Sequence, residues 1–146
     1  MAIPETALFL KRTFAAPRAK VFEAWTKPEM LLNWFAGTPD HVPCIAEVDL
    51  RVGGKYRIGM KHRPTGNEHI ATGVYQEIVA NERLVFTWRW ELGGSTNDET
   101  LVTVQLRDNG GSTEMDFKHE RFATQELAER HKQGWESCFA QFEKAV

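Results

Sequence analysis

Two histidines are the side chains of this sequence whose type and setting could support acid–base chemistry near neutral pH. His119 lies near the end of an alternating, strand-like segment, and His131 lies in a helix-like segment; each sits on an otherwise apolar face. In a pocket, an imidazole can act as general acid or base because its ordinary pKa is close to neutrality. A lone histidine on an apolar face is more commonly a hydrogen-bonded core residue. We therefore keep both as candidates and assign no catalytic residue.

Aromatic and apolar side chains would surround these histidines if the expected strand registers hold. Ligand pockets are typically concave and apolar with a few polar groups. Aromatic clusters also pack ordinary cores, so the residues alone leave both interpretations open. The residues that we expect to bind a ligand are Trp34, Phe35, Tyr56, Ile58, Met60, Phe86, Trp88, Trp90, Met115, Phe117, His119, His131 and Trp135.

Four further polar side chains are candidates for the same pocket. Tyr75 and Thr87 would face it only if Gly73 shifts the register of its strand, because a glycine inside a strand often marks a bulge. Glu47 and Gln76 are the other two. Which strand face lines the cavity at this glycine is left open by the sequence.

The sequence predicts no metal site and no cofactor. His41 and Cys44 are close, as are His62 and His69, but no second pair completes a recognisable four-ligand spacing. We interpret His62 and His69 as part of a solvated hairpin tip. Neither Cys44 nor Cys138 has an identifiable base, and the chain lacks a Gly-x-Ser-x-Gly elbow, a phosphate loop and a dinucleotide fingerprint.

Length and composition limit the classes of function. The 146 residues suffice for one domain with a real core, and we expect a single domain over residues 1–146. The net charge of −2, without a basic run, argues against nucleic-acid partners. No signal peptide and no apolar run of about 18 residues is visible, which argues against membrane insertion. Cys44 and Cys138 are expected to be free thiols in a reducing cytoplasm.

The segment 124–145 is predicted to be a helix that forms one wall of the pocket. Thr124 suits the N-cap position, and Glu126 and Arg130 can form an ion pair one turn apart. Gly134 costs about 1 kcal/mol relative to alanine in a helix interior. It either leaves room for a strand or a ligand, or is simply tolerated in a core helix. The apolar face, with residues spaced by three or four, consists of Leu127, His131, Trp135, Cys138 and Phe142.

Alternation of apolar and polar residues predicts strands along most of the remaining chain. Two short helices are expected after the first strand, opened by Pro17 and Pro28, since proline is tolerated at the first helical position. Gly53-Gly54 suits a tight hairpin turn, and residues 93–98 suit a flexible loop. The strands are expected over residues 7–14, 45–52, 55–61, 68–79, 84–91, 101–106 and 113–120.

This order of elements predicts the fold class. Successive strands joined by short turns must be antiparallel neighbours. One face of each strand is apolar and the other charged, so one side of the sheet meets the core and the other meets water. The C-terminal helix is the only element long enough to cover a curved sheet of about seven strands. We therefore predict an α+β fold in which a curved antiparallel sheet wraps around that helix.

The order of elements resembles the helix-grip fold of the START-like, or SRPBCC, superfamily. The segment Asp49-Leu50-Arg51-Val52-Gly53-Gly54 resembles the D-x-R-x-G-G hairpin of the family related to the activator of the heat-shock chaperone ATPase. Its glycines serve the turn, and its charged residues are expected to point outward. The resemblance covers nearly the whole chain, in blocks at residues 17–25, 34–35, 49–56, 73–78, 82–88 and 134–135.

The resemblance implies a deep cavity between the sheet and the long helix, and it favours a ligand pocket over a packed core. It implies no single activity, because superfamily members include lipid and sterol carriers, polyketide aromatases and cyclases, and small resistance proteins. The eukaryotic chaperone activators carry a second, N-terminal domain for which this chain has no room. This difference argues against a chaperone partner.

Three hypotheses of function follow. The first is binding of a small hydrophobic or aromatic molecule in the cavity. The second is an enzyme of cyclase, aromatase or hydrolase type that uses His119 or His131 as acid–base. The third is a stress-response protein that stimulates a chaperone ATPase. A homodimer, formed through an edge strand or the pair of short helices, is compatible with each.

Overall fold

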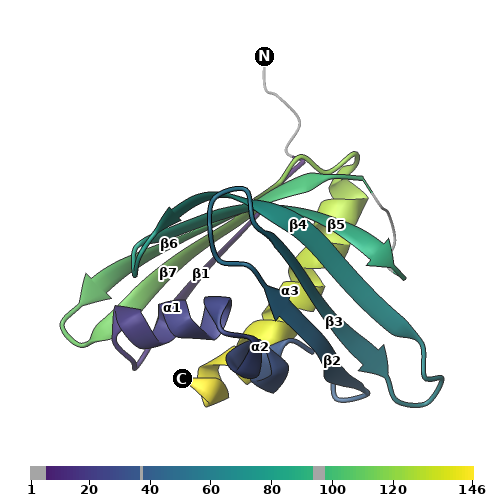
Figure 1. Ribbon diagram of the computed structural model, residues 1–146, viewed down its shortest axis with the longest axis horizontal. Helices are drawn as coiled ribbons and strands as arrows, with labels where there is room; N and C mark the ends of the chain where they lie inside the picture. The colour runs from purple at the N-terminus through teal and green to yellow at the C-terminus, as the bar shows by residue number, and fades with distance from the viewer. Residues whose placement is uncertain (1–5, 37, 94–97) are drawn as a thin grey trace.

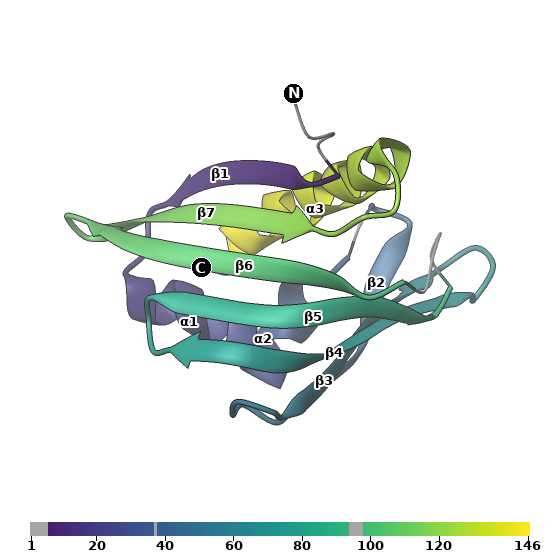
Figure 2. The same ribbon diagram turned by 90° about the horizontal axis from the view of Figure 1, so that it is seen from above.

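The computed structural model describes residues 6–36, 38–93 and 98–146. Its strands form one seven-stranded antiparallel sheet with the order β1-β7-β6-β5-β4-β3-β2 (Figure 2). The helices are α1 (Arg18–Thr26), α2 (Pro28–Trp34) and α3 (Gln125–Ala145). The strands are β1 (Leu8–Phe14), β2 (His41–Val48), β3 (Lys55–His62), β4 (Glu68–Val79), β5 (Arg83–Leu92), β6 (Thr100–Asn109) and β7 (Ser112–Glu120).

The sheet arches over the three helices, and α3 runs diagonally beneath it (Figure 1). The predicted α+β helix-grip architecture is confirmed, including the two short helices after the first strand. Within the described residues, none of the helices combines the length and the apolar composition needed to cross a bilayer.

The sequence features predicted for α3 are present. The Thr124 side chain caps the helix by accepting a hydrogen bond from the Leu127 amide at 3.2 Å. Arg130 donates to Glu126 at 2.8 Å, the predicted ion pair across one turn. The face that meets the sheet is buried, because apolar side chains spaced by three or four share one side of a helix. Its buried residues are Ala128, His131, Trp135, Cys138, Phe139 and Phe142.

The boundaries of β2 differ from the prediction. The strand spans His41–Val48 instead of 45–52, and residues 49–52 form a turn in which the Arg51 amide donates to the Asp49 carbonyl at 2.9 Å. Gly53 has a φ of 86°, and a Cβ on Gly54 would collide with that same carbonyl oxygen. The turn therefore needs more residues than a two-residue hairpin does, and the strand ends at Val48 instead of residue 52.

One smaller prediction also changed. Pro17 is the N-cap of α1, not its first helical residue; its carbonyl accepts the amides of Lys20 and Val21. Pro28 does occupy the start of α2, as predicted. The loop expected over residues 93–98 lies largely outside the described residues, because 94–97 are not described.

Candidate functional site

The concave side of the sheet and α3 line a partly open cavity of about 150 Å³, which we call the main cavity. Its walls are almost entirely apolar and include three tryptophan side chains. Concave apolar spaces with a few polar groups are the usual form of small-molecule sites. The lining residues are Phe35, Met60, Trp88, Trp90, Arg130, His131, Gly134, Trp135 and Cys138.

Regular secondary structure places these side chains together. His131, Trp135 and Cys138 recur every three or four residues and therefore share one side of α3. Trp88 and Trp90 are two residues apart on β5 and therefore share one face of that strand. The walls thus come from rigid elements, with Met60 of β3 and Phe35 at the end of α2 completing them.

Gly134 lies on the helix wall of the main cavity and is exposed. A Cβ built on this residue would meet no atom within 4 Å. The sequence allowed Gly134 to leave room for a strand or for a ligand. No strand packs against it, so the space beside it is open to a ligand. A larger side chain would project into the cavity without a clash at its first carbon.

His119 lies behind the main cavity in a complete hydrogen-bond network. The Trp135 indole N–H donates to His119 Nδ1 at 3.0 Å, so this nitrogen carries no proton. The neutral ring then bears its proton on Nε2 and donates to Thr100 Oγ1 at 2.7 Å. The Thr100 hydroxyl in turn donates to the Trp88 carbonyl at 2.9 Å.

His131 makes the same kind of pairing at the cavity wall. The Trp90 indole N–H donates to Nε2 at 2.9 Å, which leaves the proton of the neutral ring on Nδ1. That Nδ1–H donates to the Leu127 carbonyl at 2.8 Å. Each of the two histidines therefore uses both ring nitrogens and accepts from a tryptophan.

Electrostatics favour the neutral form of both rings. Burial and the neighbouring His131 hold the pKa of His119 well below its ordinary value of 6.5. Burial also lowers the pKa of His131, although its bond to the Leu127 carbonyl opposes the shift. Protonation would point an N–H of the ring at an indole N–H. The geometry suits structural histidines better than proton-transfer groups.

Trp88 carries the one unsatisfied buried side-chain donor found among the described residues. The side chain is 2% exposed, and its Nε1–H has no hydrogen-bond partner there. An unsatisfied buried donor costs about 1–3 kcal/mol, so native structures rarely retain one without a reason. The residue that bears it lines the main cavity.

The residues expected from sequence to bind a ligand fall into three groups. Phe35, Met60, Trp88, Trp90, His131 and Trp135 line the main cavity. Tyr56, Ile58 and Phe86 instead line a hollow of only about 10 Å³, with Trp25, Leu31 and Tyr75; we call these six residues the packed half. Trp34, Met115, Phe117 and His119 are fully buried and line neither space.

Sequence reasoning missed three of the lining residues as site residues. The sequence places Cys138 on the apolar face of the helix and allows Gly134 to leave room for a ligand, but it assigns neither to the pocket. Arg130 had been treated only as the ion-pair partner of Glu126. Its position one turn before Gly134 is the signal that could have identified it, because residues four apart are neighbours on a helix surface.

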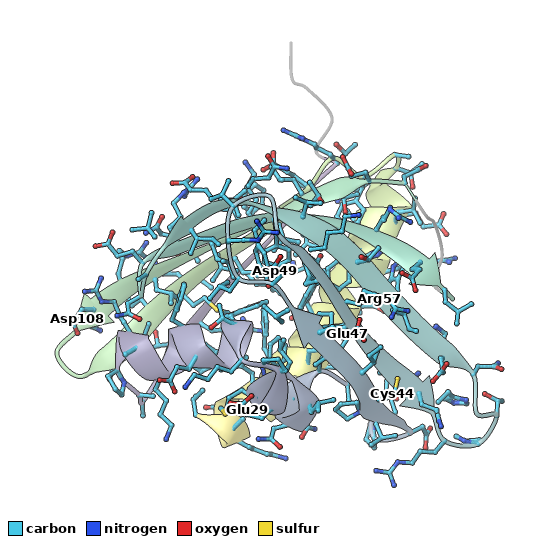
Figure 3. The ribbon with its side chains drawn as sticks, viewed as in Figure 1. Glu29, Cys44, Glu47, Asp49, Arg57 and Asp108 are labelled. Carbon is cyan, nitrogen blue, oxygen red and sulfur yellow. The ribbon has the colours of Figure 1, made fainter. Side chains whose placement is uncertain are left out.

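The other polar candidates have structural roles or lie outside. Glu47 pairs with Arg57 at 3.3 Å on the neighbouring strand (Figure 3). Gln76 is exposed. Tyr75 is buried in the packed half, and the β4–β5 register does shift beside it. The Thr87 hydroxyl accepts the Val74 amide at 2.8 Å.

The remaining histidines gather at the end of the sheet formed by β2, β3 and β4. The His41 ring lies 5.0 Å from that of His62 and 5.6 Å from that of His69, centre to centre. Within the described part of the chain, no group of three or more His, Cys, Asp or Glu side chains is arranged to hold a metal ion.

Neither cysteine is activated as a nucleophile. Cys44 and Cys138 are free thiols, on β2 and α3 respectively. Burial raises the pKa of Cys138 to about 12, and burial together with the nearby Glu68 raises the pKa of Cys44. Thiolate is the reactive form, so these shifts disfavour covalent chemistry at either residue.

Solved structures of similar fold come from several bacteria. A protein from Chromobacterium violaceum is 26% identical with a TM-score of 0.87, over 97% of this chain and 96% of that one. An uncharacterized protein from Rhizobium leguminosarum is 27% identical with a TM-score of 0.79, over 97% and 94%. An AHSA1-like protein from Aeromonas hydrophila, 21% identical with a TM-score of 0.76 over 95% and 92%, shares the fold.

Sequence comparison assigns the family. No curated protein sequence matches the chain significantly. The family model described as "Activator of Hsp90 ATPase homolog 1-like protein" matches residues 15–146, which include α1, α2, α3 and every strand except β1. Through this match, the chain belongs to the Activator of Hsp90 ATPase homolog 1-like family.

Proposed function

We propose that this protein binds a small apolar or aromatic molecule in the main cavity. The observation that carries the proposal is a space of about 150 Å³ whose walls include the rings of Phe35, Trp88, Trp90 and Trp135. An apolar cavity of about this volume can hold benzene. We therefore expect a ligand whose buried part is about one ring in size.

The hydrogen bonds around the histidines favour binding over catalysis. An acid–base role would require His119 or His131 to exchange a proton with a substrate. Both nitrogens of each ring are already paired with protein groups. Binding requires only the shape and the apolar surface of the cavity. The free thiols of Cys44 and Cys138 favour a reducing cytoplasm as the compartment where the protein acts.

A substitution at Gly134 tests the proposal. Gly134→Leu should fill the cavity from its helix wall, because the first added carbon meets no atom within 4 Å. We expect the affinity for acetophenone, a single-ring probe, measured by isothermal titration calorimetry or NMR titration, to fall by about tenfold or more. The folded state should be retained, since leucine is a better helix former than glycine.

Gln133→Leu is the matched control. Gln133 is also exposed on α3, next to Gly134, but does not line the main cavity. It adds a leucine to the same turn, so it should leave the affinity for acetophenone unchanged. Equal affinities of the wild-type protein and Gly134→Leu would contradict the proposal, as would the absence of any binding to the wild-type protein.

A further inference from the structure

The five tryptophans of the chain differ in what their indole N–H groups contact. Four donate within the protein: Trp25 to Met115 Sδ, Trp34 to the Ala24 carbonyl, Trp90 to His131 and Trp135 to His119. Trp88 alone has no partner among the described residues. The other four indoles are satisfied, so the unused N–H of Trp88 is the exception among the described tryptophans.

The polar groups on the wall of the main cavity are otherwise already used. Both nitrogens of His131 are occupied, and Trp90 and Trp135 donate to histidines. The guanidinium of Arg130, at the exposed side, donates to Glu126. No carboxylate lines the cavity. Trp88 therefore brings the unused side-chain donor of this wall, an N–H that is buried in the ligand-free structure, and the lining residues have no free side-chain nitrogen or oxygen acceptor.

We propose that the natural ligand carries a hydrogen-bond acceptor, such as a carbonyl or ether oxygen, next to its apolar ring, and that the Trp88 indole turns on binding so that its buried Nε1–H donates to this atom. This inference rests on the proposed function and narrows its ligand class. Aromatic walls can also bind cations through their ring faces. Here the positive guanidinium of Arg130 would repel a cation, and no lining carboxylate would compensate for this repulsion.

Two probes of nearly the same shape isolate the hydrogen bond. Acetophenone and α-methylstyrene differ by a carbonyl oxygen in place of a methylene group. The two probes differ in their free energy of transfer out of water. This difference does not depend on the protein variant, so it cancels when variants are compared. We expect Trp88→Phe to lower the affinity for acetophenone about fivefold more than the affinity for α-methylstyrene. This is the usual net effect of one neutral hydrogen bond.

Trp90→Phe is the matched control. Its indole also lines the main cavity, but its N–H is already given to His131. This variant should weaken both probes by similar factors. Equal losses for the two probes in Trp88→Phe would overturn the inference and leave the proposed function intact. Failure of both probes to bind the wild-type protein would overturn the proposed function and this inference with it.

A measurement on the wild-type protein keeps the test independent of whether Trp88→Phe folds. The Trp88 indole N–H proton resonance should move downfield when acetophenone binds, and should not when α-methylstyrene binds. The indole resonances of Trp25 and Trp34, which are buried with partners of their own, serve as internal references. Phenyltrimethylammonium binding more tightly than acetophenone would overturn the inference in favour of a cationic ligand.

Discussion

Beneath one continuous sheet, the packed half leaves a hollow of about 10 Å³, whereas the main cavity has a volume of about 150 Å³. Both are walled by aromatic side chains from neighbouring strands. The packed half is filled by Trp25 of α1, whose ring lies 6.3 Å from Phe86 and 5.8 Å from Phe117. The main cavity faces Gly134 of α3, where no side chain enters.

Aromatic strands therefore do not by themselves make a pocket. Trp88 and Phe86 are neighbours on the same face of β5, yet they line different spaces. What separates them is the covering element: α1 places Trp25 against the packed half, whereas α3 presents Gly134 to the main cavity between His131 and Trp135. Substitutions in the packed half should therefore mainly change the free energy of unfolding, and substitutions in the main cavity should mainly change ligand affinity.

The largest effect is expected in the packed half. Trp25→Ala should lower the free energy of unfolding by about 3–5 kcal/mol, because truncating a large buried ring leaves a cavity that the surrounding structure cannot close. Denaturation in urea, followed by circular dichroism, measures this loss. A loss below about 1 kcal/mol would mean that Trp25 does not hold the packed half together.

Low pH should destabilise the protein mainly through His119 and His131, on the side of the main cavity. The pKa values of His119 and His131 are lowered in the folded protein, so below pH 6.5 the unfolded chain binds more protons than the folded one. Stability is full above that pH and falls as the pH drops. Between pH 7 and pH 5, urea midpoints should report a loss of about 2–4 kcal/mol for both histidines together.

Substitution of one histidine separates this effect from general acid sensitivity. His119→Gln should flatten the dependence of stability on pH between 7 and 5 by about half. Phe86→Leu, which changes the packed half without removing a titratable group, should lower stability by the same amount at both pH values. A slope unaffected by His119→Gln would show that His119 is protonated to the same extent in both states.

The smallest effect has the opposite sign. Gly134→Ala should raise the free energy of unfolding by about 1 kcal/mol, because alanine favours the helix and its Cβ meets open space. Ala24→Leu is the counterpart on α1, where Ala24 is fully buried; its added carbons should overpack the core and destabilise the protein. Thermal unfolding of both variants checks the two signs. Destabilisation by Gly134→Ala would show that the space beside the glycine is not open.

Much of the fold could be predicted from sequence because its signals are local. The spacing of apolar residues identified α3, and alternation identified the strands. The end of β2 was misplaced, because the collision that requires Gly54 involves a carbonyl brought back by the turn itself. The predicted start of α1 was one residue too early, at Pro17 instead of Arg18, since the N-cap and the first helical residue both tolerate a missing N–H.

The site was less predictable, because it depends on what meets across the core. Sequence placed Phe86 and Trp88 on one strand face correctly but could not tell that α1 fills the space beside one and not the other. Nor could it show that His119 accepts a hydrogen bond from the Trp135 indole, or that the Trp88 indole has no acceptor among the described residues. These facts arise between residues far apart in the chain.

The pairing of β1 with β7 also has a consequence for how the protein is made. Phe14 lies opposite Thr113, and contacts so distant in sequence slow folding. At about 5–20 residues per second, the ribosome adds the partner strand on the order of ten seconds after β1. Leu8 and Leu10, buried in the finished sheet, stay uncovered during that interval. The nascent chain therefore cannot complete its fold until nearly all of it has left the ribosome.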